Sequence, residues 1–427
     1  MNILITHGYS DSNKGDLAIT LATYLFLRDN YPNSKIILHS TFRKSAKDFN
    51  YHNRFMSKQN IIINQGILPS PYSSSSKSVF LDLLAVFRLI IEVLQLKISL
   101  FFPWLGKIIG GNQYKSLVDF KNTDLVIVKG GQFIYNDKED LRGNLFLWRT
   151  LQPLKIAKKL NKKVIIFGQS FGGFATQKSE KMAIKYLDYC HIIMAREKVS
   201  LNFLNKYNLI SKSIKIPDLA FYLKKVYLNN NNIYAKLPTN IFGVTVVNWN
   251  FPESEDPKVA KTNYINTLFE GIKYAYNTFG LTPVFIPQVT VKHHGESDND
   301  IVNILQKNLK KEGVFNIFLK EDLSTNQMMQ IYKNCHFLIG TRLHSCILSA
   351  NVETPIIAIR YQGYKTQGIM EELDLSNLVL DINTIRLNDL ISKMNYVNNN
   401  KNNIKKTLKK QTDQFVNQFE KIDFFNI

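Results

Sequence analysis

Several signatures that mark common enzyme and binding classes are missing from this chain. It has only three cysteines, Cys190, Cys335 and Cys346, and no CxxC pair, which excludes a disulfide framework and a standard zinc site. The HExxH, GxGxxG and P-loop motifs do not occur, so the first half of the chain has no recognised nucleotide-binding loop.

Acidic residues are also scarce relative to basic ones. There are 34 Asp and Glu against 54 Lys and Arg, a net charge of +20 over 427 residues. Part of this excess solvates the surface, and the rest favours an acidic partner such as a phosphorylated small molecule, an anionic membrane or nucleic acid.

The N-terminus lacks a basic region ahead of an apolar one. Met1–Gly8 is typical of a first core strand and not of a signal peptide. Together with the cysteine usage, this predicts a cytoplasmic location.

No apolar run reaches the roughly 18 residues of a membrane-spanning helix. Residues 79–111 come nearest, but Asp82, Arg88, Glu92 and Lys97 interrupt them and leave one apolar face on a helical wheel. Two interpretations stay open: a helix packed on its own domain, or a helix lying on the cytoplasmic face of the inner membrane.

The length and the alternation of strands with helices predict two α/β domains with doubly wound, Rossmann-like parallel sheets. We expect an N-terminal domain over 1–225, on the acceptor side, with a polar surface insertion over 43–77 and an apolar insertion over 66–120. A C-terminal domain over 226–400 is expected to hold the donor, followed by a tail helix over 401–427. Two such domains facing across a cleft resemble the GT-B architecture, with ligands at the carboxyl ends of strands.

The strongest local motif is Thr341-Arg342-Leu343-His344, which follows the apolar strand 336–340 and precedes a helix expected near Ser345. A helix N-terminus favours anions, and a guanidinium holds a carboxylate or phosphate through two hydrogen bonds. His344 carries an imidazole, the side chain that most often serves in proton transfer. The alternative is that Arg342 pairs with a structural acid and His344 caps the helix.

Two other cations follow predicted strands. Lys365 comes after strand 355–361 and is placed to approach the same pocket, or is an exposed lysine. Arg196 ends strand 191–195 and faces the cleft, or forms an ion pair with Glu197 or a nearby residue.

Polar and glycine-rich turns follow the other strands. Asn13 and Asp16 open the first helix as a cap, or bind the acceptor. Gly131, in the pair after strand 124–128, allows close approach of a ligand to the backbone. His293, His294, Asp298 and Asp300 match no metal-site spacing, and a loop with a helix-capping aspartate is the favoured interpretation.

The ordered series of motifs resembles the polysaccharide pyruvyl transferase family over residues 1–40 and 120–375. It consists of Asn13-x-Gly15-Asp16, Gly130-Gly131, Gly168-Gln169-x-x-Gly172, Ala195-Arg196-Glu197, Pro217-Asp218-x-Ala220-Phe221, Gly340-Thr341-Arg342-Leu343-His344, Pro355–Ile359 and Lys365.

The resemblance implies a GT-B-like fold and transfer from phosphoenolpyruvate to a pair of sugar hydroxyls, giving a pyruvate ketal on a cell-surface polysaccharide or its precursor. It implies that Arg342 and His344 are catalytic or bind the donor, with Arg196 as a second donor ligand, and it leaves the roles of Asp298 and Asp300 open. No cofactor, metal or nucleic acid is expected; the partners are phosphoenolpyruvate, a sugar or lipid-linked glycan, and the membrane.

Two other functions remain open at this point. One is a GT-B glycosyltransferase with a sugar-nucleotide donor, although no base- or ribose-binding loop is evident. The other is a non-catalytic protein that binds glycans or membranes, which the basic charge and the apolar segment suit and Arg342 and His344 do not.

Overall fold

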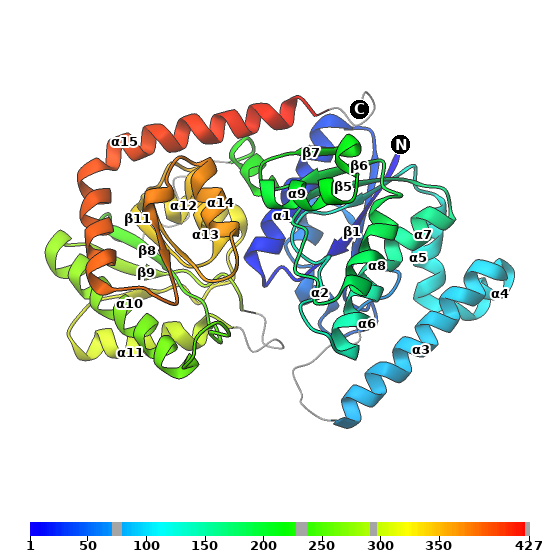
Figure 1. Cartoon of the computed structure of the whole chain (residues 1–427), viewed down its shortest axis with the longest axis horizontal. Coiled ribbons are helices and arrows are strands. Elements are labelled where there is room, and N and C mark those ends of the chain that lie inside the picture. The colour runs from blue at the N-terminus through cyan, green and yellow to red at the C-terminus, as the bar shows by residue number, and fades with distance from the viewer. Residues whose placement is uncertain (71–78, 228–236, 291–296, 423–427) are drawn as a thin grey trace. The chain divides into compact units, whose positions relative to one another are not determined.

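The computed structural model describes residues 1–70, 79–227, 237–290 and 297–422, which form two compact units (Figure 1). One unit comprises Met1–Asp11 and Ile19–Leu219, and the other comprises Ser12–Ala18 and Ala220–Ile422. The start of the first long helix is thus grouped with the second unit.

The first unit is built on a seven-stranded sheet in the order β3-β2-β1-β4-β5-β6-β7, and every neighbouring pair is parallel. The strands are β1 (Asn2–Gly8), β2 (Lys35–Ser40), β3 (Ile62–Gln65), β4 (Leu125–Val128), β5 (Lys163–Gln169), β6 (Ile192–Ala195) and β7 (Ser213–Lys215). The order reverses between β1 and β4, which confirms a doubly wound sheet.

The helices that accompany this sheet are α1 (Lys14–Asn30), α2 (Phe49–His52), α3 (Val79–Phe101), α4 (Pro103–Ile109), α5 (Gly111–Lys121), α6 (Leu141–Thr150), α7 (Gln152–Lys159), α8 (Gln177–Leu187) and α9 (Lys198–Lys206). Short 3-10 turns lie at η1 (Met56–Gln59), η2 (Ile210–Lys212) and η3 (Leu219–Lys224).

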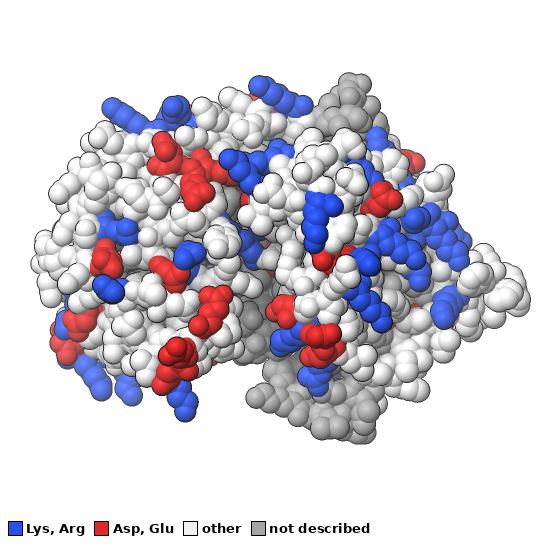
Figure 2. Space-filling model, viewed as in Figure 1, with Lys and Arg blue, Asp and Glu red and all other residues white. Residues whose placement is uncertain are grey.

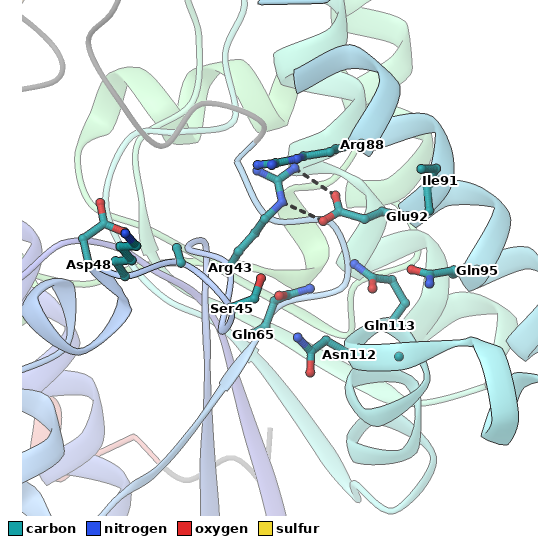
Figure 3. A pocket seen from close by; sticks show the side chains of 13 residues that line it. Arg43, Ser45, Asp48, Gln65, Arg88, Ile91, Glu92, Gln95, Asn112 and Gln113 are labelled. Atoms are coloured by element: carbon teal, nitrogen blue, oxygen red, sulfur yellow. Dashed lines mark hydrogen bonds and ion pairs between the residues drawn. The ribbon is translucent and has the colours of Figure 1, made fainter. Parts of the chain in front are cut away.

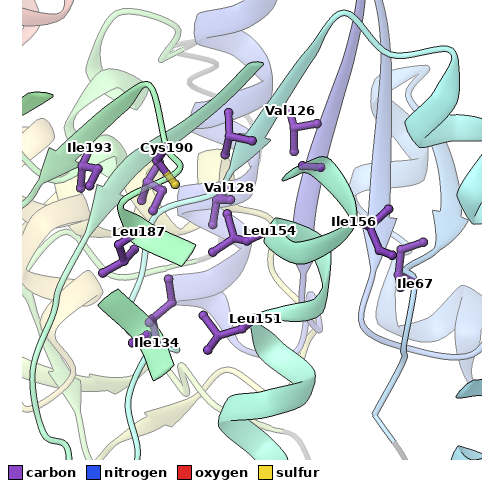
Figure 4. Close-up of a cluster of buried hydrophobic side chains, with 14 of the residues drawn as sticks. Ile67, Val126, Val128, Ile134, Leu151, Leu154, Ile156, Leu187, Cys190 and Ile193 are labelled. Carbon is purple, nitrogen blue, oxygen red and sulfur yellow. The ribbon is translucent and has the colours of Figure 1, made fainter. Parts of the chain in front are cut away.

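The core of the first unit forms where helices cover the middle strands. All four residues of β4 are buried, as a parallel strand with helices on both faces requires. Figure 4 shows Val126 and Val128 of this strand among Leu151 and Leu154 from the helical side and Ile193 from β6. Burial of such side chains contributes about 1.5–3 kcal/mol each.

The second unit has a six-stranded sheet in the order β10-β9-β8-β11-β12-β13, again parallel at every pair. The strands are β8 (Ile241–Thr245), β9 (Thr282–Phe285), β10 (Ile317–Phe318), β11 (Cys335–Gly340), β12 (Ile356–Arg360) and β13 (Val379–Asp381). This sheet reverses between β8 and β11 and is also doubly wound.

Its helices are α10 (Pro257–Phe279), α11 (Asn299–Lys311), α12 (Thr325–Asn334), α13 (Leu343–Asn351), α14 (Lys365–Glu372) and α15 (Leu387–Glu420), with a 3-10 turn at η5 (Ser376–Leu378). Local sequence explains the bounds of α10. Asp256 accepts hydrogen bonds from two first-turn N–H groups, Pro257 occupies the first turn, and Gly280 closes the helix with a left-handed φ of 64°.

The expectation of a surface insertion over 43–77 is wrong for its middle part, because β3 pairs in register with β2 and extends the sheet. A strand of four residues at a sheet edge, with only Gln65 buried, carries too little apolar periodicity to stand out.

The apolar segment expected over 66–120 contains α3, α4 and α5. Leu117 and Phe120 of α5 enter the core of the first unit. Among the described residues, no helix is long and apolar enough to cross a membrane.

The tail helix expected from residue 401 is the second half of α15. That helix runs across the expected boundary, and only Asn400 departs from helical angles, with φ −112° and ψ 16°.

Candidate functional site

The Thr341–His344 turn lies where the second sheet reverses its strand order. The backbone N–H of Thr341 donates to the carbonyl of Thr245, the last residue of β8, at 3.1 Å. The hydroxyl of Thr341 is 2.9 Å from that of Tyr264, and the Thr245 and Ser345 hydroxyls are 2.8 Å apart. Because Thr341 is fully buried in these contacts, it holds the turn in place.

Arg342 is the N-cap residue of α13, and its guanidinium is ion-paired with Asp298. Nη2 and Nε of Arg342 lie 2.6 Å and 3.1 Å from Oδ1 of that carboxylate. The Asp298 carboxylate in turn accepts the backbone N–H groups of Gln288 and Val289 at 2.8 Å and 2.9 Å. The structural acid that the sequence left open for Arg342 is therefore present.

This pairing fixes both the charge and the plane of the guanidinium. Burial works against the charged form of Arg342, but the Asp298 carboxylate outweighs it and raises the pKa of the arginine. Nη1 faces the Tyr361 hydroxyl at 3.3 Å, and the Tyr361 ring packs edge-on to Trp249 with centroids 5.0 Å apart. Arg342 is thus a permanent cation in one orientation.

Asp298 does not cap α11, contrary to expectation. It occupies the N-cap position, but its side chain makes no capping hydrogen bond because Arg342 and the two backbone N–H groups use it. Asp300 accepts a hydrogen bond from Asn248 at 3.2 Å. His293 and His294 lie outside the described residues, and within those residues no His, Cys, Asp and Glu side chains group as a metal site.

His344 sits in the first turn of α13, directly against Gly15. A Cβ atom added to Gly15 would lie 2.4 Å from Nδ1 of His344, so any other residue at that position requires the imidazole to shift. Both residues belong to the second unit. The Asn13–Asp16 and Thr341–His344 motifs, more than 320 residues apart in sequence, therefore meet.

The rest of the first motif is fixed in the same unit. Asn13 caps α1 by accepting the backbone N–H of Asp16 at 3.3 Å and forms a bridge with Val289. The backbone N–H of Lys14 donates to the carbonyl of Gln288 at 2.8 Å, and its buried ammonium lies 2.7 Å from Asp322. Sequence analysis did not single out Lys14, although it stands inside the motif.

Leu343 and Lys365 are half-buried. Lys365 opens α14 after β12, the neighbour of β11 in the sheet, so it follows an adjacent carboxyl strand end as expected.

Arg196 lies in a buried polar network of the first unit. Its Nη1 is 2.7 Å from Asp218, its Nη2 donates to Ser170 at 2.6 Å, and its Nε lies 3.4 Å from Glu197. These contacts realise the ion pair that the sequence left as the alternative to donor binding. They tie the end of β6 to the Pro217-Asp218 turn.

Three basic side chains gather where the first sheet reverses between β1 and β4. Lys129, the residue after β4, is fully buried. Burial, together with the charges of Lys129 and Arg149, lowers the pKa of His7 to about 3, against a hydrogen bond to the Thr150 carbonyl. Burial and the charge of Arg43 together lower the pKa of Arg149 to about 10. Sequence analysis missed this cluster, although Lys129 directly follows an apolar strand.

Gly131 and its neighbour occupy the same edge of the first sheet. Gly131 has a φ of 136° and bridges Gln169 at the end of β5. A Cβ at Gly130 would lie 2.7 Å from the Gly168 carbonyl oxygen, so the close approach at this glycine pair is to backbone.

A polar pocket of about 650 Å³ lies beyond the carboxyl ends of β2 and β3 (Figure 3). Across it, Arg43 makes a two-pronged ion pair with Glu92 of α3 at 2.7 Å and 3.1 Å. Gln113 of α5 is 2% exposed, and no hydrogen-bond partner for its Nε2 lies among the described residues. Figure 3 shows its amide beside those of Gln95 and Asn112.

Solved structures define the class of fold. The UDP-GlcNAc 2-epimerase of Methanocaldococcus jannaschii matches with a TM-score of 0.54 at 13% identity, covering 93% of each chain. Anabaena HepE, in complex with UDP and glucose, matches with a TM-score of 0.53 at 10% identity, over 98% of this chain and 95% of that one. The Neisseria meningitidis UDP-GlcNAc 2-epimerase matches with a TM-score of 0.56 at 11% identity, over 99% of this chain and 100% of that one. With two doubly wound parallel sheets, the chain has a GT-B-like fold.

Sequence relatives narrow the class. The model of the polysaccharide pyruvyl transferase family matches residues 13–363, from the Asn13 motif to beyond the Thr341–His344 turn. The chain belongs to this family. The amylovoran biosynthesis protein AmsJ of Erwinia amylovora is 26% identical over 439 residues, covering 97% of this chain and 96% of AmsJ.

Proposed function

We propose that the protein transfers the pyruvyl group of phosphoenolpyruvate to two hydroxyls of a sugar in a cell-surface polysaccharide or its precursor. Membership of the polysaccharide pyruvyl transferase family supports the reaction class. The likeness to a protein named for amylovoran biosynthesis supports a polysaccharide pathway.

The bonds formed and broken in this reaction balance as follows. Two sugar oxygens bond to C2 of phosphoenolpyruvate, and the bond from C2 to the phosphate oxygen breaks. One hydroxyl proton ends on the methylene carbon, which becomes a methyl group, and the other leaves with inorganic phosphate. The site must therefore move protons and stabilise positive charge at C2 beside a dianionic leaving group.

The Thr341–His344 turn supplies the groups for this task. His344 is the proton carrier in our proposal, because it is the imidazole at the carboxyl end of β11 and in the first turn of α13. Arg342, the first-turn N–H groups of α13 and Lys365 attract the carboxylate and phosphate of the donor. Thr341 and Leu343 shape the turn.

The observation that carries this proposal is the packing of Gly15 on His344. It brings together the two motifs most distant in sequence, and the substitution of glycine by any other residue would displace the imidazole. Asp298 adds rigidity by holding Arg342 in one plane. A catalytic group needs such fixed support to act efficiently.

Acceptor binding is assigned to the first unit. The polar pocket beside β2 and β3 lies at the carboxyl edge where ligands of doubly wound sheets bind. Its amides and charged groups are typical partners of sugar hydroxyls and phosphates. Gly131 of this unit remains a candidate contact with the acceptor, as do Asn13 and Asp16 of the second unit. Arg196 remains a candidate for the donor, with its guanidinium held by Asp218, Ser170 and Glu197.

We place the reaction in the cytoplasm. The thiols of Cys190, Cys335 and Cys346 are all buried and form no disulfide, which suits a reducing compartment.

The proposal is tested by binding and by turnover. Phosphoenolpyruvate at 100 times its Kd should stabilise the protein by about 2.7 kcal/mol, whereas UDP-glucose should leave the melting temperature unchanged. Incubation with phosphoenolpyruvate and candidate nucleotide-linked or lipid-linked glycans should release phosphate and add a pyruvyl mass to one glycan. Stabilisation by the sugar nucleotide alone would favour a glycosyltransferase instead.

A further inference from the structure

Helices α3 and α4 lie on the outside of the first unit (Figure 1). They expose an unusual amount of apolar surface. Eleven of the twenty-two exposed large hydrophobic side chains in the described residues fall between positions 84 and 109. They are Leu84, Val86, Phe87, Ile90, Ile91, Leu94, Phe101, Phe102, Trp104, Ile108 and Ile109. A contiguous apolar patch of this kind marks an interaction surface.

The patch is one face of α3. Ala85, Leu89, Glu92, Leu96 and Ser99 are buried and fall within about a quarter of the helical wheel, against the first unit. The exposed apolar residues fill the opposite half. Arg88 and Lys97 stand at the two rims of that half.

Helix α4 continues the patch. It packs closely on α3 through small residues: a Cβ at Gly106 would lie 2.5 Å from Cα of Ser99. Its outward side chains, Trp104 and Ile108, are 69% and 73% exposed. Next to them, the ammonium of Lys159 lies 3.9 Å from the centroid of the Phe101 ring.

The exposed charges that α3 and α4 carry from residue 84 onward have one sign. Every exposed charged residue of α3 and α4 from residue 84 onward is basic, namely Arg88, Lys97 and Lys107. The acidic residue of this stretch, Glu92, is buried and paired with Arg43. Figure 2 shows the surface at α4, on the right-hand edge, as mostly white with Lys and Arg beside it.

We propose that the α3–α4 face is a membrane-binding surface, which lies in the headgroup region of a bilayer that contains anionic lipid. A helix with a broad apolar face, basic rims and an exposed tryptophan has the chemistry of an interfacial helix. A basic rim matches an anionic lipid surface, whereas a second copy of this face would bring its own basic rim into contact with like charge.

The position of the polar pocket links the membrane-binding surface to acceptor binding. This inference rests on the proposed function. Arg88 and Ile91 belong both to the exposed face and to the wall of the pocket. The pocket therefore opens at the lipid boundary, where it can receive the polar head of a membrane-anchored molecule. The acceptor is accordingly a glycan on a lipid carrier.

Vesicle sedimentation tests the surface without any substrate. The full chain should sediment with vesicles of phosphatidylcholine and phosphatidylglycerol, bind pure phosphatidylcholine at least tenfold more weakly, and be released by high salt. Fluorescence of Trp104 should shift to the blue on binding and should be quenched by brominated lipid.

Two variants separate the contributions. Replacing Phe87, Leu94 and Ile108 by asparagine removes exposed apolar groups only and should abolish sedimentation. Lys97→Gln with Lys107→Gln should weaken binding to anionic vesicles roughly fivefold for each lysine. The matched control replaces Ile304 and Phe315, exposed apolar residues of the second unit, by asparagine and should bind as the unaltered chain does. Circular dichroism checks that each variant is folded.

Other outcomes would overturn the proposal. These are no binding of the folded chain to anionic vesicles, equal binding by the asparagine variant of the face, or a dimer that the same three substitutions dissociate while vesicles remain unbound. The last result would make the face a self-association surface.

The lipid-carrier step has its own readout. The unaltered chain should pyruvylate a polyprenyl diphosphate-linked glycan in vesicles at least tenfold faster than the same glycan free in solution. The asparagine variant of the face should lose this advantage but keep the rate on the free glycan. Equal rates on both glycans would overturn the carrier assignment alone, and no transfer to either would contradict the proposed reaction while leaving vesicle binding intact.

Discussion

At the residue scale, the site depends on buried charges that hold one another. The Arg342–Asp298 pair joins residues 44 positions apart, and the Asp298 carboxylate receives two further backbone N–H groups. An isolated buried charge is costly, so each partner requires the other.

We predict that Asp298→Asn destabilises the protein by about 3–5 kcal/mol, because it leaves the Arg342 guanidinium buried without a counter-charge. Urea unfolding measures this free energy. Asp381→Asn is the matched control. Its ion pair with Arg360 is partly exposed, and we expect a loss below about 1 kcal/mol. Equal losses of unfolding free energy in the two variants would contradict the role of Asp298 as the counter-charge of a buried guanidinium.

Gly15→Ala should impair turnover more than stability. The new methyl group overlaps Nδ1 of His344 and displaces the imidazole. We expect kcat to fall at least tenfold. Overpacking should lower the free energy of unfolding by about 1–3 kcal/mol. Gly368→Ala, at a helical position with no atom within 4 Å of the added Cβ, is the control for loss of a helical glycine. Unchanged kcat in Gly15→Ala would mean that the position of His344 does not matter.

The sequence identified the residue types of the site but not their partners. Arg342 and His344 could be selected because they follow an apolar strand and precede a helix. Asp298, Tyr264 and Lys14 could not, because their contacts depend on how distant segments pack in three dimensions.

At the scale of elements, strong hydrophobic runs were predictable and weak ones were not. Residues 125–128, 164–167 and 337–339 are continuous apolar stretches, and the structure has strands there. Strand β3 was not predicted, because it is short and lies at the edge of the sheet. Helix α13 begins two residues earlier than expected, which makes Arg342 its N-cap residue.

The hairpin of α3 and α4 offers a prediction at this scale. Gly106→Val should push α4 away from α3, since even a Cβ at this position would meet Ser99. We expect a loss of about 1–3 kcal/mol and a weaker blue shift of Trp104 on anionic vesicles, because α4 would no longer continue the face. Gly368→Val, with no atom near the added Cβ, is the control. An unaltered vesicle response would show that the face does not require the hairpin.

At the scale of the whole molecule, the parallel alternation of strands and helices sufficed to predict two doubly wound sheets, and the ordered motifs predicted the family. The division between the units could not be read from the sequence. Contacts of the Ser12–Ala18 segment group it with residues more than 200 positions away.

The stability of the protein in acid should depend on His7, a member of the basic cluster of the first sheet. The pKa of His7 is lowered to about 3 in the folded protein, chiefly by burial, against about 6.5 in an unfolded chain. The unfolded state therefore binds a proton first, and stability is present above pH 6.5 and falls as the pH drops towards 3.

His7→Asn removes this titration and keeps a residue that tolerates the φ of 66° at this position. Relative to His7→Asn, the unaltered chain should lose at most about 1.4 kcal/mol of unfolding free energy for each pH unit below 6.5. Urea unfolding at pH 7.0, 5.5 and 4.5 measures it. A difference that stays constant with pH would contradict a buried, neutral His7.

The most direct test of the central claim is a comparison of acceptor-dependent phosphate release from phosphoenolpyruvate by the unaltered chain, His344→Gln and His191→Gln. Our account predicts turnover by the unaltered chain and by His191→Gln, which alters an exposed histidine of the first unit. It predicts a kcat lower by about 100- to 10,000-fold for a folded His344→Gln. Full turnover by His344→Gln, or no pyruvyl transfer by the folded unaltered chain to any glycan, would contradict it.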